Sequence, residues 1–328
     1  MTISAGLDVH KDECHGVIMD EDGEILKDEK FENSLAGVRE FFRGFKHANV
    51  VMESSYSWRP TYERLEEIGI ESKLAHPKRT RAIAESEIKT DSIDARTLTH
   101  LLRAGLVHES YVPPDEIREL RDKVRLRTKL VRERTKFKNK IWAELEKNRV
   151  KIEKNPFTKK GKEKLRELNI SSVDHYLAVL ETIDERIKMV SKELEGIAED
   201  REDARLLMTI PGISHFSALL ILAEIGEIDR FPDPEKLCSY AGLVPKVHKS
   251  GDTVRIGGIK NGGDKLLRWI MIECVWFHVN HGDSHLTKYY ERKKREKDSK
   301  RAAIATANKL LTVIYWMLTR KEEFRPNG

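Results

Sequence analysis

The sequence predicts an N-terminal α/β domain with a mixed sheet, then a long helical arm, and then an all-α C-terminal domain. Residues 3–111 alternate between strand-like and helix-like segments, and residues 115–150 are strongly cationic with no proline or glycine. Residues 173–197 carry apolar side chains at steps of three and four, the spacing of a helix that packs along one stripe. A chain of 328 residues exceeds one typical core, so we expect domains at 1–112, 113–200 and 201–328.

The first domain opens on a strand, because Ile3, Ala5, Leu7 and Val9 alternate with small or polar residues. The elements expected after it are strands at 15–19 and from residue 25, a helix capped by Ser34, a strand at 49–52 ending at Glu53, a helix at 58–68 and a strand at 72–75. Three strands, a helix, a strand, a helix and a strand follow the order of the ribonuclease-H-like fold.

Two long helices are expected to form the arm. The second has an unbroken apolar seam of Val173, Tyr176, Leu180, Ile183, Ile187, Val190, Leu194 and Ile197. The first has a weaker seam, which Arg127, Arg134 and Lys138 interrupt. We expect an antiparallel helical hairpin, or a coiled-coil arm that pairs with another subunit, with a basic, mobile loop at 155–161.

The C-terminal domain is expected to be helical throughout. Its segment Ile210-Pro211-Gly212-Ile213 resembles a helix-hairpin-helix turn, whose backbone amides can hold a DNA phosphate, although an ordinary helix connection fits as well. The apolar stretch 206–226 contains Pro211, Gly212, His215 and Glu224, which predicts a buried helical hairpin and a poor membrane span.

Four acidic residues form the first candidate site. Asp8 lies inside a strand, where aspartate is disfavoured, and Glu53 ends another strand. Asp91 and Asp94 are one helical turn apart, so their carboxylates point the same way. Such acids can meet at one end of a sheet and hold one or two Mg²⁺ ions for phosphoryl transfer. Alternatively, Asp91 caps a helix with Asp94 in its first turn.

Ser250 is the second candidate. It precedes a glycine-rich, cationic run and could attack a phosphodiester while Lys249, Arg255, Lys260 and Arg268 neutralise the phosphate. The other interpretation is a polar surface turn.

The motifs that contain these residues resemble those of one family. They are Gly6-Leu7-Asp8-Val9-His10-Lys11, Glu53, Lys89-Thr90-Asp91-Ser92-Ile93-Asp94-Ala95, Ile210-Pro211-Gly212-Ile213, Tyr240-Ala241-Gly242-Leu243-Val244-Pro245, Ser250-Gly251 and Lys260-Asn261-Gly262-Gly263. They occur in order over nearly the whole chain and resemble the DEDD transposases of insertion sequences, also called bridge recombinases, which include pilin-gene invertases.

The resemblance implies a RuvC-like domain in which Asp8, Glu53, Asp91 and Asp94 bind Mg²⁺, or Mn²⁺ in its place. It implies that Ser250 is a nucleophile forming a covalent phosphoserine link to DNA, and that the acids and the serine can come from different subunits. It also implies double-stranded DNA and a structured guide RNA as partners. A homo-oligomer, dimer or tetramer, would form through the coiled coil.

Other features bound the function. Three separated cysteines favour a reducing compartment, and no signal peptide is expected at the N-terminus, so we expect a cytoplasmic, nucleoid-associated prokaryotic protein without a membrane partner. His278, His281 and His285 lack the cysteines or acids that a zinc site needs. Two alternatives remain: a metal-only RuvC-like nuclease that leaves no adduct, and a non-catalytic nucleic-acid-binding scaffold.

Overall fold

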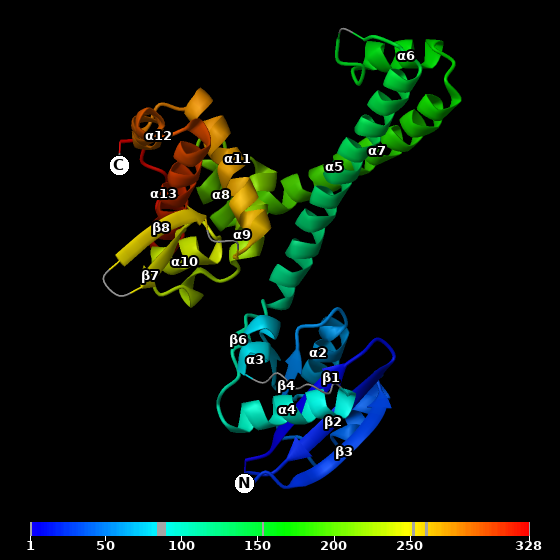
Figure 1. Cartoon of the computed structure of the whole chain (residues 1–328), viewed down its shortest axis with the longest axis vertical. Helices are drawn as coiled ribbons and strands as arrows, with labels where there is room; N and C mark the ends of the chain where they lie inside the picture. The colour runs from blue at the N-terminus through cyan, green and yellow to red at the C-terminus, as the bar shows by residue number, and fades with distance from the viewer. Residues whose placement is uncertain (1, 84–89, 153, 251–252, 260–261, 328) are drawn as a thin grey trace. The chain divides into compact units, whose positions relative to one another are not determined.

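The computed structural model describes residues 2–83, 90–152, 154–250, 253–259 and 262–327. The chain divides into two compact units, residues 1–112 and 113–328 (Figure 1). Each unit has its own apolar clusters, and each is described by itself.

The first unit is built on a mixed six-stranded sheet with the order β3-β2-β1-β4-β5-β6. The strands are β1 Ser4–Val9, β2 Glu13–Met19, β3 Ile25–Glu32, β4 Asn49–Glu53, β5 Ser72–Ala75 and β6 Glu109–Ser110. β1, β2 and β3 run antiparallel, β1, β4 and β5 run parallel, and β6 pairs antiparallel with β5. The expected mixed sheet of ribonuclease-H-like order is confirmed, and only the short β6 was not predicted.

Helices cover both faces of this sheet. α1 Leu35–Phe41 and α2 Trp58–Glu67 pack on one face and α4 Asp91–Arg103 packs on the other, while α3 Pro77–Ile83 follows β5 in the chain. Ala5, Leu7 and Val9 of β1 share a cluster with side chains of α1 and α2. The alternate residues face α4, because a Cβ on Gly6 would lie 2.3 Å from the Ala95 carbonyl oxygen. The period of two therefore decides which β1 side chains meet α4.

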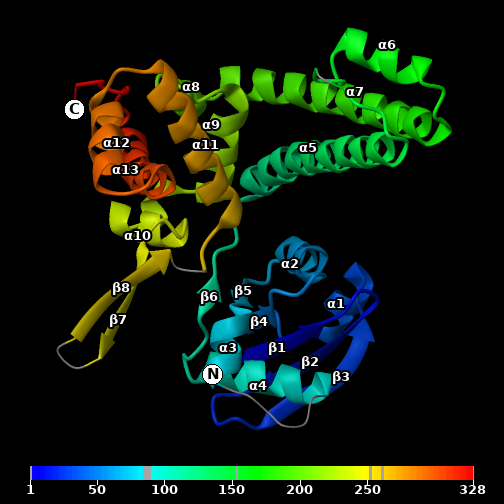
Figure 2. The same cartoon turned by 45° about the horizontal axis from the view of Figure 1, so that its top comes forward.

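The second unit begins with a hairpin of long helices. These are α5 Asp115–Lys147 and α7 Ser171–Asp200, with α6 Lys159–Glu167 at their far end (Figure 2). α5 and α7 lie side by side, and Ile141 and Leu145 of α5 share a cluster with Leu177 and Leu180 of α7.

The expectation of a mobile loop over 155–161 is wrong for its last residues. α6 already begins at Lys159, because the Thr158 hydroxyl accepts a hydrogen bond from the Gly161 amide at 3.1 Å and caps the helix. Leu165 of α6 is fully buried against the hairpin. A cap and one apolar anchor thus order this short, cationic helix.

The remainder of the second unit is mostly helical. Its helices are α8 Glu202–Met208, α9 His215–Ile225, the 3₁₀ turn η1 Ile228–Arg230, α10 Pro234–Tyr240, α11 Lys265–His281, α12 His285–Glu296 and α13 Ser299–Arg320. An all-α domain was expected, but β7 Pro245–Ser250 and β8 Thr253–Ile259 form an antiparallel pair. Val247, Val254 and Ile256 are β-branched and favour strands, a preference that the glycines nearby concealed.

The turn Ile210-Pro211-Gly212-Ile213 connects α8 to α9 and packs on α11. Gly212 has a φ of +99°, and a Cβ there would lie 3.0 Å from the His278 amide nitrogen. The Ile213 amide donates to the Ile210 carbonyl at 3.1 Å. Glycine is required here by both the backbone conformation and the close approach.

By length and composition, α13 is apolar enough to cross a membrane, and 56% of its most apolar window is buried in the protein. Ala302, Ala307, Leu310, Leu311 and Ile314 of this helix are fully buried in the largest apolar cluster. α13 is therefore a central core helix of the second unit.

Candidate functional site

Asp8 and Glu53 lie at the ends of neighbouring parallel strands. Leu7 of β1 pairs with Met52 of β4, so Asp8 and Glu53 follow this pair at the same level of the sheet. Asp8 is two residues beyond Gly6, and Glu53 is two residues beyond Val51, which packs against Leu98 of α4. Both acidic residues therefore occupy positions on the face that α4 covers.

α4 carries the other two acids in its first turn. The Thr90 hydroxyl accepts from the Ile93 amide at 3.2 Å, so Thr90 caps the helix. The alternative in which Asp91 is the cap is thus wrong, and both Asp91 and Asp94 lie inside the helix. Their position is set by the close packing of α4 on Gly6.

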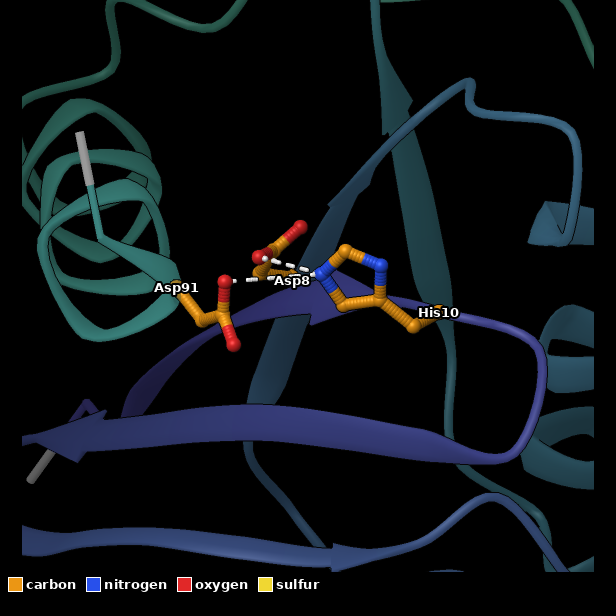
Figure 3. Close-up of side chains that lie close together, drawn as sticks. All are labelled: Asp8, His10 and Asp91. Atoms are coloured by element: carbon orange, nitrogen blue, oxygen red, sulfur yellow. Dashed lines mark hydrogen bonds and ion pairs between the residues drawn. The ribbon is translucent and has the colours of Figure 1, made fainter.

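His10 bridges two of these carboxylates (Figure 3). Its Nε2 lies 3.2 Å from Asp8 Oδ2 and 3.5 Å from Asp91 Oδ1. One ligand atom of each of these three residues lies within 4.8 Å of the others. Within the described residues, Asp94 and Glu53 do not belong to this tight group, although Asp94 is near enough to act on the Asp8 charge.

Sequence reasoning missed His10 as a site residue. It lies just beyond β1, and the Asn33 side-chain amide fixes its backbone by donating to the His10 carbonyl at 2.8 Å. Asn33 in turn accepts from Thr61 Oγ1 at 2.9 Å and Arg64 at 2.7 Å, both in α2. The spacing Asp8-x-His10 was visible, but the bend that turns His10 back toward Asp8 depends on this distant network.

The charges explain why the site would gain from a cation. Burial raises the pKa of Asp8, and the charges of Asp91 and Asp94 raise it further, while His10 acts in the opposite direction. A carboxyl whose ionised form is opposed by burial and by two like charges is stabilised when a cation joins the group.

Lys30 of β3 holds Asp91. Its Nζ lies 2.9 Å from Asp91 Oδ2 and 2.9 Å from Glu13 Oε1. The hydrogen bond from Lys30 keeps the pKa of Asp91 below its usual range. Asp91 therefore stays ionised beside Asp8 and remains available as an oxygen ligand.

Asp28, two residues earlier on β3, fastens the start of α4 to the sheet. It accepts from His15 Nε2 at 2.6 Å, from Arg96 Nε at 2.7 Å and weakly from Ser92 Oγ at 3.4 Å. Burial alone would raise the pKa of Asp28, but the bonds from His15 and Arg96 outweigh it and lower the pKa. Ser92 lies between Asp91 and Asp94 and Arg96 follows them in α4, so these contacts orient the two acids.

The donor set fits a divalent metal. Carboxylate oxygens from Asp8 and Asp91, with Asp94 and Glu53 on the same face, are hard ligands suited to Mg²⁺ or Mn²⁺. The His10 nitrogen adds a ligand that Mn²⁺ accepts more readily than Mg²⁺.

Ser250 is the last residue of β7 and pairs with Thr253 of β8. Lys249 lies beside it in β7 and Arg255 lies in β8. The structure describes only the backbone of these three residues, and Lys260 lies outside the described residues. Arg268 of α11 is described, and its guanidinium donates to the carbonyls of Gly242 and Gly262 at 3.3 and 3.2 Å. It ties the base of the β7–β8 pair to α11.

The three histidines considered for zinc make other contacts. His278 is buried, with Nδ1 2.7 Å from the Pro211 carbonyl oxygen and Nε2 2.7 Å from Ser284 Oγ. Nδ1 of His281 and of His285 contacts a backbone carbonyl, of Phe277 and Pro326 respectively. No metal-ligand group is found at these histidines within the described part of the chain.

The fold and the site together define a ribonuclease-H-like protein with a carboxylate-rich site at one end of its sheet. A family model for DEDD transposases of the IS110 kind, described as "Transposase", matches residues 5–148, and the "Transposase IS116/IS110/IS902 family" model matches residues 204–291. The chain therefore belongs to the IS110/IS116 family of DEDD transposases, which makes it a DNA-cleaving enzyme.

Individual proteins similar to this chain include the transposases of two insertion sequence elements. The chain is 24% identical to the transposase of insertion sequence element IS1111A from Coxiella burnetii, over 98% of this chain and 90% of that protein. It is 25% identical to the transposase of element IS1328 from Yersinia enterocolitica, over 96% of each. A pilin gene-inverting protein of Moraxella bovis is 34% identical over 37% of this chain and 38% of its own length. Among solved structures, Thermus thermophilus RuvC bound to a Holliday junction matches with a TM-score of 0.28 and 12% identity, over 34% of this chain and all of RuvC.

Proposed function

We propose that this transposase cuts and rejoins DNA by phosphoryl transfer at a divalent-metal site formed by Asp8, Glu53, Asp91 and Asp94. The observation that carries the proposal is the approach of Asp91 to Asp8, which the packing of α4 on Gly6 produces. Like charges brought together in a partly buried place are costly, unless a cation offsets their repulsion.

The four carboxylates would hold Mg²⁺, or Mn²⁺ in its place. When bound, the metal supplies Lewis acidity that stabilises charge on the transferring phosphate. The protein's own residues orient the ligands: Lys30 keeps Asp91 ionised, and Asp28 holds the first turn of α4. His10 lies where its imidazole can contact the metal or the phosphate.

We further propose that Ser250 forms the covalent intermediate. Its Oγ would form a bond to phosphorus while the bond from phosphorus to the leaving deoxyribose oxygen breaks. The proton lost by the serine hydroxyl would end on that leaving oxygen. Attack by a deoxyribose hydroxyl would then release the serine and rejoin the strand. The position of Ser250 at the end of β7, among cationic residues, supports this role.

The partners follow from the same proposal. Double-stranded DNA is the substrate, a structured RNA selects it, and the α5–α7 hairpin joins copies of the chain into a dimer or tetramer. Residues 1–112 would bind the metal, 113–200 would form the arm, and 201–328 would carry the serine. The protein would act on the nucleoid in the cytoplasm.

The experiment incubates the protein with Mg²⁺ or Mn²⁺ and DNA that carries its gene with flanking sequence, together with RNA transcribed from that flank. Cleavage, rejoining and a protein–DNA adduct that resists detergent are measured. Asp8→Asn removes a metal ligand and should lower cleavage by at least about 100-fold, because loss of even an outer partner of a ligand typically costs roughly 10- to 100-fold. Ser250→Ala should abolish the adduct.

The other outcomes separate the alternatives. If the natural protein cleaved DNA without forming an adduct, and Ser250→Ala cleaved it equally well, the protein would be a metal-only nuclease. A protein that binds DNA but neither cleaves it nor binds Mn²⁺ in a calorimetric titration would be a scaffold, and the proposed metal chemistry would be wrong.

A further inference from the structure

Three cations of α5 lie in the seam where a helical hairpin usually places apolar side chains. Arg127, Arg134 and Lys138 step by seven and four residues, and all three are only partly exposed. Arg127 Nε lies 2.9 Å from Ser191 Oγ of α7, and Arg134 lies 3.7 Å from Asp184 of α7. Arg127 and Arg134 therefore face α7 and not the opposite, solvated side of α5.

The apolar packing of the hairpin is interrupted at this place. Leu120 and Val124 of α5 belong to the cluster at one end of the hairpin, and Ile141 and Leu145 belong to another cluster at the far end. The cations fill the interval between the two clusters. An apolar seam along the whole length would bury more surface and stabilise the hairpin more.

These cations have too few anionic partners in the protein. Asp184 contacts both Arg134 and Lys162 of α6, the latter at 3.1 Å, and it is the one carboxylate paired with this group in the described part of the chain. The buried Nε of Arg134 has no hydrogen-bond partner among the described residues. Lys138 is packed against the Phe157 ring, 4.9 Å from its centre.

The electrostatics agree with an excess of positive charge. Burial lowers the pKa of Lys138 and the charge of Arg134 lowers it further, while the charge of Asp184 opposes this and that of Lys162 adds a smaller lowering. Burial also lowers the pKa of Arg127, with a contribution from Arg134. Burial and a neighbouring cation therefore disfavour the charged forms of Arg127 and Lys138, and an added anion would offset that penalty.

We propose that Arg127, Arg134, Lys138 and Lys162 form a binding site for the phosphate backbone of a nucleic acid, within the α5–α7 hairpin. Guanidinium groups bind phosphate oxygens through paired donors, and the ammonium groups add point charges. Two turns of helix separate Arg127 from Arg134, roughly 10 Å, so the group can contact more than one phosphate along a strand. The choice of nucleic acid as the anion rests on the proposed action on DNA.

The test compares two triple variants that remove the same charge from the same helix. The seam variant is Arg127→Gln, Arg134→Gln and Lys138→Gln, and the control is Lys129→Gln, Arg132→Gln and Lys136→Gln, whose side chains are more exposed or lie off the seam. Both are made in the full chain with Asp8→Asn, without divalent metal, so binding is measured apart from cleavage. The probes are a 30-base-pair DNA duplex and an RNA duplex of the same sequence, each titrated at several salt concentrations.

The seam variant should weaken binding of at least one duplex by 10-fold or more. The slope of log Kd against log salt should fall by roughly 0.9 for each phosphate that the variant no longer neutralises. The control should weaken binding much less. The duplex that shows the difference identifies whether DNA or RNA occupies the site.

A second measurement separates function from structure. Arg134→Leu with Lys138→Leu should raise the melting temperature of the hairpin while it weakens binding, because the seam becomes apolar. Equal weakening in the seam and control variants would overturn the proposal, as would a lower melting temperature in the leucine variant. Unchanged binding with a loss of self-association would overturn it as well, and would make a second copy of the chain the occupant.

Discussion

At the scale of single residues, the ring of His278 shows how a histidine can be committed to structure. Both ring nitrogens are engaged, one with the Pro211 carbonyl and one with the Ser284 hydroxyl, and the ring is almost fully buried. Burial lowers the pKa of His278 from 6.5, and the neighbouring His285 lowers it further, although the bond to Pro211 opposes this. The folded protein therefore disfavours the protonated ring.

We expect this histidine to make the second unit less stable in acid. Below pH 6.5 the His278 ring of the unfolded chain takes up a proton that the folded chain resists. The free energy of unfolding therefore decreases as the pH is lowered, until the pH is below the lowered pKa of His278 in the folded protein. The loss is at most about 1.4 kcal/mol per pH unit for one group. The free energy of unfolding, measured with urea between pH 8 and pH 5, should decrease more steeply with acidification in the natural protein than in His278→Gln. Parallel curves would mean that His278 does not cause it.

The sequence predicted those residues of the candidate site whose role follows from the pattern of their neighbours in the chain. Asp8 in a strand of apolar neighbours, Glu53 at a strand end, and Asp91 and Asp94 one turn apart were all visible in the sequence. His10 was not, because its approach to Asp8 depends on Asn33, which is 23 residues away. Lys30 and Asp28 were missed for the same reason: they meet α4 only after β3 pairs with β2.

At the scale of elements, α4 can approach β1 closely because residue 6 is a glycine and has no side chain. A Cβ on Gly6 would lie 2.3 Å from the Ala95 carbonyl oxygen and 2.7 Å from the Thr99 amide nitrogen. Both atoms belong to the helix backbone, so they cannot turn away as a side chain would. Gly196 is the opposite case, because it lies inside α7 with nothing within 4 Å of an added Cβ.

We therefore expect opposite effects from the same substitution at these two glycines. Gly6→Ala should destabilise the first unit by about 1–3 kcal/mol and weaken Mn²⁺ binding, because α4 must move away from β1 with Asp91 and Asp94. Gly196→Ala should stabilise the second unit by about 0.5–1 kcal/mol, since glycine is a poor helix residue. Urea unfolding and calorimetric Mn²⁺ titration measure both. Unchanged Mn²⁺ affinity in a folded Gly6→Ala protein would contradict the role assigned to this contact.

The elements that sequence reasoning missed lack long patterns. The first five strands, α5 and α7 have clear periods, and the ends that were predicted for them lie within a few residues of those observed, whereas for α4 only its first turn was expected. α6 has nine residues and one buried leucine, so its amphipathic signal is short. β7 and β8 stand among glycines and cations that also fit a loop, and only their pairing with each other distinguishes them.

At the scale of the whole chain, each apolar cluster of the described residues lies entirely within residues 1–112 or entirely within residues 113–328. Val112 packs against the cluster of β1, α1 and α2, and the clusters of the second unit contain only later residues. Pro113 and Pro114 follow at once, and Pro114 caps α5. Consecutive prolines restrict the backbone and donate no amide hydrogen bond. Neither a strand of the first unit nor helix α5 can therefore extend through them.

The two units should therefore fold independently when residues 1–112 and 113–328 are produced separately. Each retains its own apolar core, and the first retains the acidic residues with Lys30 and Asp28. We expect each fragment to unfold cooperatively in urea, and the 1–112 fragment to bind Mn²⁺ with the affinity of the full chain. Asp8→Asn in that fragment is the control and should remove the binding. If the first unit were more than about 1 kcal/mol more stable in the full chain than alone, the units would be coupled, because independent folding units contribute additively.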